Sequence, residues 1–253
     1  MRPQQAALLG AVQGVAEVVP VSSSAQLALL PWLLGWRQAS SRTGFGAALH
    51  LGSCTGIALG LRRELAGLEP REGLALMASC LPAAAAGVLA GDAVERQLGG
   101  PAQLAGALGA AGALLWLADR APEEAPVVTG RHLAVAAVAQ VAALVPGVSR
   151  QGAVLTALRL QGVSRAPAAR TSLLMSLPLT AGAALLPLAR ADRATLRELA
   201  PLVRAGLPAA ALSGALSASA WRRRPAGSTT PAAVYRLGLA AAVAVRLRAA
   251  RRA

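Results

Sequence analysis

Long apolar runs make up most of the chain, and short charged or proline-containing segments separate them. A helix needs about 20 consecutive apolar residues to cross a bilayer. Runs near this length predict six spans, at residues 46–61, 73–91, 102–118, 172–189, 199–220 and 232–247. Pro82 lies inside the second run, and a proline at such a position kinks or breaks a helix. The pattern predicts an all-α polytopic membrane protein.

Two other apolar stretches are too short to span a bilayer, and each is interrupted at a proline. The first, at about 4–34, runs to Pro20 and then resumes. The second, at about 133–161, runs to Pro146 and then resumes. Non-helical backbone at membrane depth is tolerated only where protein buries it or where it lines a water-filled cavity. We therefore predict two re-entrant helical hairpins, which enter the membrane and return.

The two breaks share a pattern that indicates an internal repeat. Both read Val-Pro-x-x-Ser, which pairs Ser23 with Ser149, and both follow an apolar run that contains a glutamine. Transporter-like folds place the broken helices of two repeats together near the bilayer midplane. We therefore expect Glu17 and Ser23 to approach Ser149 and Arg150. Chance similarity in a chain rich in Ala and Val is the alternative.

The hairpins and spans divide the chain into two comparable halves. We predict a single membrane domain over residues 1–253, with repeat one at 1–120 and repeat two at 131–253. The most polar linker of the chain joins them. Because each repeat holds one hairpin and three spans, an odd number, one repeat should be inverted relative to the other. The expected architecture is an inverted repeat of about six transmembrane helices plus two re-entrant hairpins.

Composition supports a membrane protein and argues against other classes. Hydrophobic residues make up 55% of the chain and charged residues only 14%, although the net charge is +14. We interpret the arginines as contacts to membrane lipid headgroups and to an anionic ligand. Nucleic-acid binding is not expected, because there is no soluble basic domain and no aromatic stacking platform. Cys54 and Cys80 are expected to be packed thiols, and no zinc-like spacing occurs.

Glu17 is the most informative residue of the first hairpin. It is the only acidic residue before Glu64, and it lies in an apolar run. A carboxylate within a membrane segment costs at least about 3 kcal/mol, so such residues usually face a cavity, a partner or an ion. A signal peptide is the alternative, since Met1-Arg2 precedes an apolar stretch. An acid in the apolar region argues against it, as does the lack of a soluble domain afterwards.

The breaks also hold groups suited to an anion. Small residues gather there, namely Ser22, Ser23, Ser24, Gly147, Ser149 and Gly152. Arg150 begins the returning helix, and a helix N-terminus with an arginine is a ready anion site. A divalent ion could bridge Glu17 to phosphate oxygens. A lipid-linked phosphate is the expected ligand. The alternative is structural: serines that only cap helices, and an arginine that reaches a headgroup.

These residues resemble those of the undecaprenyl-diphosphatase family, the bacitracin-resistance type of membrane phosphatase. That family shows Glu/Gln-x-x-x-Glu running into Pro-Val-Ser-Ser-Ser/Thr-Gly-His, and later Pro-Gly-x-Ser-Arg-Ser-Gly. Here the first motif reads Gln13-Gly-Val-Ala-Glu17 and then Pro20-Val-Ser-Ser-Ser-Ala-Gln26. The second reads Pro146-Gly-Val-Ser-Arg-Gln-Gly152. Further similar segments lie at residues 45–53, 163–178 and 235–238.

The resemblance implies a function. The reaction would be hydrolysis of undecaprenyl diphosphate to undecaprenyl phosphate and phosphate, which recycles the lipid carrier for peptidoglycan synthesis and confers bacitracin resistance. The enzyme would lie in the bacterial cytoplasmic membrane, with its active site toward the outer face. It would use a divalent cation, Mg²⁺ or Ca²⁺. A homodimer is one oligomeric state compatible with the resemblance.

The resemblance also implies roles for individual residues. Glu17, Ser23 and Arg150 would be catalytic: Ser23 as nucleophile or phosphate ligand, and Arg150 to neutralise charge on the phosphoryl oxygens. Glu17 and Gln13 would hold the metal or orient water. The substrate-binding residues would be Ser22, Ser24, Gln26, Gly147 and Ser149.

Four positions depart from the family pattern. Gln26 replaces its histidine, and glutamine cannot accept a proton near neutral pH. The other replacements are Ala25 for Gly, Gln151 for Ser and Val154 for Thr. Without the histidine the enzyme is expected to be slow or inactive if that group activates the nucleophile. A protein that binds or flips polyprenyl phosphate without hydrolysis is therefore the alternative. His50, the other imidazole in this part of the sequence, receives no role.

Overall fold

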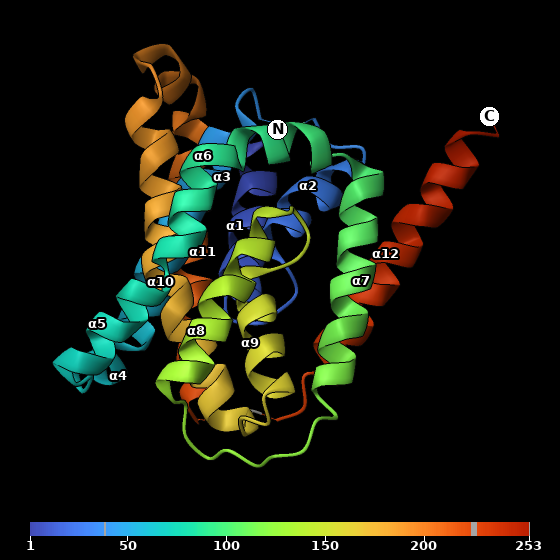
Figure 1. Ribbon diagram of the computed structural model, residues 1–253. Coiled ribbons are helices and arrows are strands. Elements are labelled where there is room, and N and C mark those ends of the chain that lie inside the picture. The colour runs from blue at the N-terminus through green and yellow to red at the C-terminus, as the bar shows by residue number, and fades with distance from the viewer. Residues whose placement is uncertain (38, 224–226, 253) are drawn as a thin grey trace. The chain divides into compact units, whose positions relative to one another are not determined.

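The computed structural model describes residues 1–37, 39–223 and 227–252, and most of them are helical (Figure 1). The predicted all-α class is confirmed. The helices are α1 (Pro3–Ala16), α2 (Ser23–Leu33), α3 (Arg42–Gly60), α4 (Arg62–Ala66), α5 (Pro70–Ser79), α6 (Leu81–Leu98), α7 (Pro101–Ala118), α8 (Gly130–Ala139), the 3-10 helix η1 (Gln140–Leu144), α9 (Arg150–Leu160), α10 (Arg165–Arg190), α11 (Arg193–Arg223) and α12 (Thr230–Ala250).

Five of the six predicted spans coincide with helices that are long and apolar enough to cross a membrane. They are α5 with α6 (Pro70–Leu98), α7, α10, α11 and α12. The chain is thus a multi-pass membrane protein. The prediction of a span at 46–61 is not supported, although α3 has 19 residues there. Its glycines and polar residues, such as His50 and Ser53, lower its hydropathy, and much of it is buried against other helices.

The helix ends follow the prolines and the polar segments. The second span breaks at Cys80, and Pro82 occupies the first turn of α6, as predicted. α10 begins two turns before the predicted span, and it contains Pro178 and Pro187 without a break. The charged segment between the first two predicted spans contains a short helix, α4. Both cysteines are packed thiols, and each contacts a carbonyl oxygen of α10.

The chain forms two compact units, and the first comprises residues 1–18, 26–69 and 177–223. In it, α11 packs against both α1 and α3. The contacts are very close: a Cβ atom on Gly10 would lie 2.1 Å from the Gly206 carbonyl oxygen, and one on Gly56 would lie 1.9 Å from that of Ala211. Small residues let helices approach backbone to backbone.

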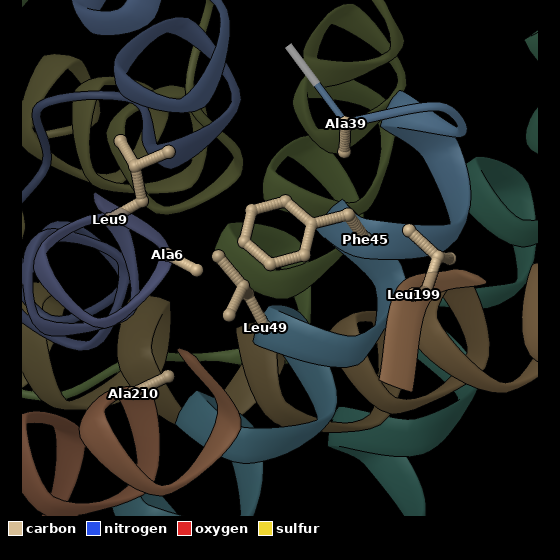
Figure 2. Close-up of a cluster of buried hydrophobic side chains, with 7 residues drawn as sticks. All are labelled: Ala6, Leu9, Ala39, Phe45, Leu49, Leu199 and Ala210. Atoms are coloured by element: carbon tan, nitrogen blue, oxygen red, sulfur yellow. The ribbon is translucent and has the colours of Figure 1, made fainter. Parts of the chain in front are cut away.

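A cluster of buried side chains holds the first unit together (Figure 2). It consists of Ala6, Leu9, Ala39, Phe45, Leu49, Leu199 and Ala210. Leu27 and Leu30 of α2 pack against this cluster. The cluster therefore fixes α2 beside α3, and it fixes the rotation of α3 because Leu49 is completely buried.

The second unit comprises residues 19–25, 70–176 and 227–252. In it, α7 lies beside α12, and α8 lies beside α9 (Figure 1). α9 also packs against α7, so the second break is enclosed by helices of its own unit. Helix, break and helix follow one another as predicted for this hairpin. The two units are defined by which residues contact one another, and this does not test whether the two halves of the chain are related by symmetry. The division into two inverted repeats therefore stays a prediction.

The polar linker after α7 is anchored by Asp119, which is 3% exposed. Its carboxylate accepts hydrogen bonds from Arg165, Ser228 and Thr230. Burial raises the pKa of this carboxyl group, but these hydrogen bonds outweigh burial and hold the pKa well below its usual range. The linker therefore joins the end of α7 to the beginnings of α10 and α12 within the second unit.

Candidate active site

Glu17 lies at the end of α1 in the first unit, and its carboxylate is buried among polar partners. Glu17 Oε1 accepts a hydrogen bond of 3.0 Å from Nε2 of Gln13, one helical turn earlier. It also lies 2.9 Å from Nδ1 of His50 on α3. Gln13 is completely buried and Glu17 is 6% exposed. Gln13 and Glu17, which the resemblance assigns together to a metal or a water, are therefore in contact, and that role stays a prediction.

His50 is the residue of this cluster that the sequence did not identify. Its Nδ1 lies 2.8 Å from Gln13 Nε2 as well as beside Glu17. Position 50 gave one signal, a polar group that lies between two leucines in a mainly apolar run. Such a group needs a partner. The sequence could not show that α1 and α3 pack together, and only that packing supplies the partner.

Gln13 and Glu17 offer the kind of oxygen atoms that bind a hard cation. Gln13 Oε1 is buried and has no hydrogen-bond partner among the described residues. In the described part of the chain, no three His, Cys, Asp or Glu side chains gather closely enough to hold a metal ion. Mg²⁺ is usually held by one or two carboxylates together with waters and substrate phosphates, so it fits this sparse set.

The serine breaks belong to the second unit, and each contains one serine with the same unusual, positive φ. Ser22 and Ser149 each have φ of 68°, in the left-handed region. This conformation costs a residue other than glycine on the order of 1–3 kcal/mol, and it is concentrated at functional sites. Each serine directly precedes a helix, since α2 begins at Ser23 and α9 begins at Arg150.

The backbone therefore pairs Ser22 with Ser149, which corrects the pairing of Ser23 with Ser149 made from Val-Pro-x-x-Ser. The second break has one more residue between its proline and its helix. Gly147 has φ of 103°, and a Cβ atom there would lie 3.0 Å from the Leu104 carbonyl oxygen on α7. Only glycine fits this position without strain.

Arg236 on α12 connects the two breaks, and sequence analysis assigned it no role beyond a resemblance. Its side chain is completely buried. Nη1 donates to the Pro20 carbonyl oxygen at 3.4 Å, and Nη2 donates to those of Gly147 and Val148 at 3.0 and 2.8 Å. The expectation that the two breaks meet is confirmed for these backbone segments. An approach of Glu17 to Ser149 and Arg150 stays a prediction.

Arg150 presents a charged group at the start of α9. Its Nη1 is buried and has no hydrogen-bond partner among the described residues. Ser149 next to it caps the helix, because its Oγ accepts from the Gly152 backbone N–H at 3.2 Å. A partly unpaired guanidinium beside a helix N-terminus suits a phosphoryl group. The second unit therefore carries the chemistry expected of an anion site.

The remaining predicted residues divide between the two units. Ser22, Ser23 and Ser24 lie in the second unit, where the Oγ atoms of Ser22 and Ser24 are 3.3 Å apart. Gln26 lies in the first unit on α2 and is 1% exposed. The first unit thus carries the carboxylate with its amide and imidazole neighbours. The second carries the serines, Gly147 and Arg150.

Known proteins resemble this chain over most of its length. A sequence model of the bacitracin resistance protein BacA family matches residues 6–242. An undecaprenyl-diphosphatase of Geobacter metallireducens is 39% identical over 227 residues, which cover 82% of this chain and 80% of that protein. One of Gemmatimonas aurantiaca is 39% identical over 228 residues, which cover 83% of this chain and 84% of that protein. One of Geobacter sulfurreducens is 38% identical over 232 residues, with coverage of 83% and 85%.

The matched region contains both breaks, the cluster around Glu17, and the arginines at positions 150 and 236. The similarity therefore includes the candidate site and is not confined to apolar helices, which unrelated membrane proteins can share by composition. This chain belongs to the bacitracin resistance protein BacA family.

Proposed function

We propose that this chain hydrolyses undecaprenyl diphosphate to undecaprenyl phosphate and phosphate, the activity for which its relatives are named. The observation that carries the proposal is Arg150, whose buried Nη1 has no partner among the described residues at the start of α9. A pyrophosphate group is a suitable ligand for such a site. The relatives support hydrolysis, and nothing in the comparisons favours binding or flipping of the lipid without hydrolysis.

The residue roles follow the chemistry at each break. Arg150 and the backbone N–H groups at the start of α9 neutralise charge on the phosphoryl oxygens as the phosphate–phosphate bond breaks. Ser23, the first residue of α2, is assigned the role of nucleophile: its Oγ bonds to the terminal phosphorus as the bond from that phosphorus to undecaprenyl phosphate breaks, and water then hydrolyses the phosphoserine and releases phosphate. Ser22, Ser24, Gly147, Ser149 and Gln26 complete the assigned substrate contacts.

Glu17 and Gln13 are assigned the role of binding the divalent cation, Mg²⁺ or Ca²⁺. The buried Oε1 of Gln13, without a partner among the described residues, supports this assignment, as does the carboxylate beside it. When bound, such a cation supplies positive charge to the phosphate oxygens and so favours departure of the leaving phosphate. Glu17 itself orients water for the hydrolysis.

The substrate class and the membrane setting are consistent. A polyprenyl diphosphate places its chain in the bilayer and its charge at the headgroup level. The protein offers five helices that are long and apolar enough to cross a membrane. We place the protein in the bacterial cytoplasmic membrane, because the carrier lipid of cell-wall synthesis is found there, with the site open to the outer face.

Phosphate release by the purified full-length chain tests the proposal. The assay uses undecaprenyl diphosphate in detergent with magnesium, and compares the wild type with Arg150→Lys. We expect turnover by the wild type and about a 10²–10³-fold lower rate in the variant, because an ammonium cannot reproduce the planar contacts of a guanidinium. Arg204→Lys, at an exposed position on α11, is the matched control and should match the wild type. A wild type that binds the lipid but releases no phosphate would refute the proposal.

A further inference from the structure

Three side chains of the first unit meet so closely that one polar atom of each lies within hydrogen-bond distance of the other two. Gln13 Nε2 lies 3.0 Å from Glu17 Oε1 and 2.8 Å from His50 Nδ1. Glu17 Oε1 and His50 Nδ1 are 2.9 Å apart. Gln13 is completely buried, and Glu17 and His50 are 6% and 16% exposed. The three atoms therefore form a small triangle that is largely removed from solvent.

Hydrogen bonds do not satisfy this triangle when Glu17 is ionised and the amide is placed as in the structure. If His50 Nδ1 carries no proton, it accepts from Gln13, and then two acceptors, Nδ1 and Glu17 Oε1, face each other at 2.9 Å. If Nδ1 carries a proton, it faces the N–H groups of Gln13 at 2.8 Å. Each arrangement leaves two like groups in contact at a buried position, which is costly.

A half turn of the Gln13 amide changes the triangle into a set of metal ligands. The turn exchanges Nε2 with Oε1, which is buried and has no hydrogen-bond partner among the described residues. The triangle then consists of an amide oxygen, a carboxylate oxygen and an imidazole nitrogen, and all three are common ligands of divalent cations. A cation replaces the repulsion with attraction. A proton shared by the three atoms is the alternative, and the experiment below distinguishes it.

The size of the triangle selects among divalent cations. Neighbouring ligands of an octahedral ion lie about 1.4 times the metal–ligand distance apart, which is about 3.0 Å for Mg²⁺ and about 3.4 Å for Ca²⁺. Sides of 2.8, 2.9 and 3.0 Å fit the smaller ion. A nitrogen ligand favours a first-row transition metal over Mg²⁺, and a site that is otherwise made of oxygens suits Mn²⁺.

Close packing holds the three groups in place before any ligand arrives. A Cβ atom on Gly14, next to Gln13, would lie 2.4 Å from a backbone nitrogen of α11. One on Gly52, two residues after His50, would lie 2.5 Å from a carbonyl oxygen of α11. Leu49 is completely buried in the hydrophobic cluster (Figure 2). Because α1 and α3 both rest directly on α11, the fold itself sets the distances between the ligands.

We propose that His50 is a metal ligand: its Nδ1, Glu17 Oε1 and the amide oxygen of Gln13 form a three-ligand site for Mn²⁺ in the first unit. The inference rests on the proposed function, which assigns a cation to Glu17 and Gln13. It adds a third ligand on another helix, and it replaces the choice between Mg²⁺ and Ca²⁺ with a small octahedral ion. The other coordination positions are left to water and phosphate oxygens.

Binding of Mn²⁺ alone to the purified full-length chain, in detergent and without a histidine tag, tests the inference. Electron paramagnetic resonance measures bound Mn²⁺, and spin-echo modulation detects a coordinated imidazole nitrogen. We expect one site per chain with a nitrogen signal, and displacement by Ca²⁺ only at large excess. His50→Gln should abolish the signal and raise the Kd for Mn²⁺ at least about tenfold, because even the outer partners of metal ligands contribute about 10- to 100-fold.

The other histidine of the chain provides the matched control. His132 completes the capping box at the start of α8 in the second unit. His132→Gln should keep both the nitrogen signal and the Kd. Because the chain has only two histidines, a signal that persists in this variant comes from His50 even if His50→Gln does not fold. Thermal unfolding in detergent shows whether each variant folds.

The outcomes separate the inference from the proposed hydrolysis, because Mn²⁺ binding is measured without substrate. A nitrogen signal in the wild type and in His132→Gln, without phosphate release from undecaprenyl diphosphate, would uphold the metal site and refute the hydrolysis. Phosphate release without Mn²⁺ binding would refute the metal site, uphold the hydrolysis and favour the shared proton. Mn²⁺ bound without a nitrogen signal, or with one that survives in His50→Gln, would also refute the role of His50.

Discussion

The two breaks share a backbone and differ in chemistry. Ser22 and Ser149 have the same φ of 68°, and each stands directly before a helix. The first break follows a buried acid, Glu17, and continues into a run of serines, whereas the second continues into Arg150. The comparison teaches that both breaks use a strained turn before a helix, and that the residues flanking it differ; under the proposed function the first break would serve a cation and the second an anion.

The breaks also differ in how they are supported. The second needs Gly147, whose φ of 103° and closeness to α7 exclude a side chain. The first has Val21 between its proline and its serine, so it needs no glycine there. Arg236 also contacts the breaks unequally, because it donates to the carbonyl of Pro20 in the first break and to two carbonyls in the second.

Removal of the Arg236 guanidinium should produce the largest change in this comparison. Arg236→Met leaves the carbonyl oxygens of Pro20, Gly147 and Val148 without their donor, and each buried unsatisfied group costs about 1–3 kcal/mol. We expect a clearly lower unfolding temperature in detergent and at least about 10²-fold slower phosphate release, since misplacement of a catalytic group by about 1 Å costs that much.

Two further variants serve as controls for the Arg236→Met experiment. Arg236→Lys should recover only part of the loss, because one ammonium cannot reach all three oxygens in a planar arrangement. Arg248→Met, at an exposed position on the same helix, should unfold and turn over like the wild type. Normal activity in Arg236→Met would show that the breaks keep their geometry without this side chain.

Substitutions of Ser149 should have a smaller effect and separate its two roles. Ser149→Ala removes the cap on Gly152 N–H and keeps a Cβ atom in the left-handed conformation, so we expect about 1 kcal/mol lower stability. Ser149→Gly also removes the cap but relieves the strain, and should cost only a few tenths of a kcal/mol. Thermal unfolding of both variants measures the difference. A glycine variant less stable than the alanine variant would contradict the backbone assignment.

Much of the fold followed from the sequence. Prolines and polar segments marked the ends of the long helices, because an apolar run ends where its backbone must leave the helix. The predicted span at 46–61 falls on α3, which is not among the helices apolar enough to cross a membrane. Its glycines serve contact with α11, and a buried helix does not need the hydropathy of one that faces lipid.

The candidate site was predicted only in part. Glu17 and Arg150 could be identified because a charged residue is costly in an apolar setting, and Ser22 could be identified because hydroxyl groups gather at the break before a helix. His50 and Arg236 could not, because their roles arise from contacts between helices that are far apart in the chain. The pairing of Ser22 with Ser149 likewise depends on backbone angles that a motif does not reveal.

The most direct test of the account is phosphate release from undecaprenyl diphosphate by the wild type and Glu17→Gln, measured side by side in detergent with magnesium. The account predicts many turnovers by the wild type despite Gln26. It predicts a rate in Glu17→Gln lower by about 10²-fold or more, because the amide cannot supply the negative charge required of a cation ligand. Equal rates in the two proteins would contradict the central role given to this buried carboxylate.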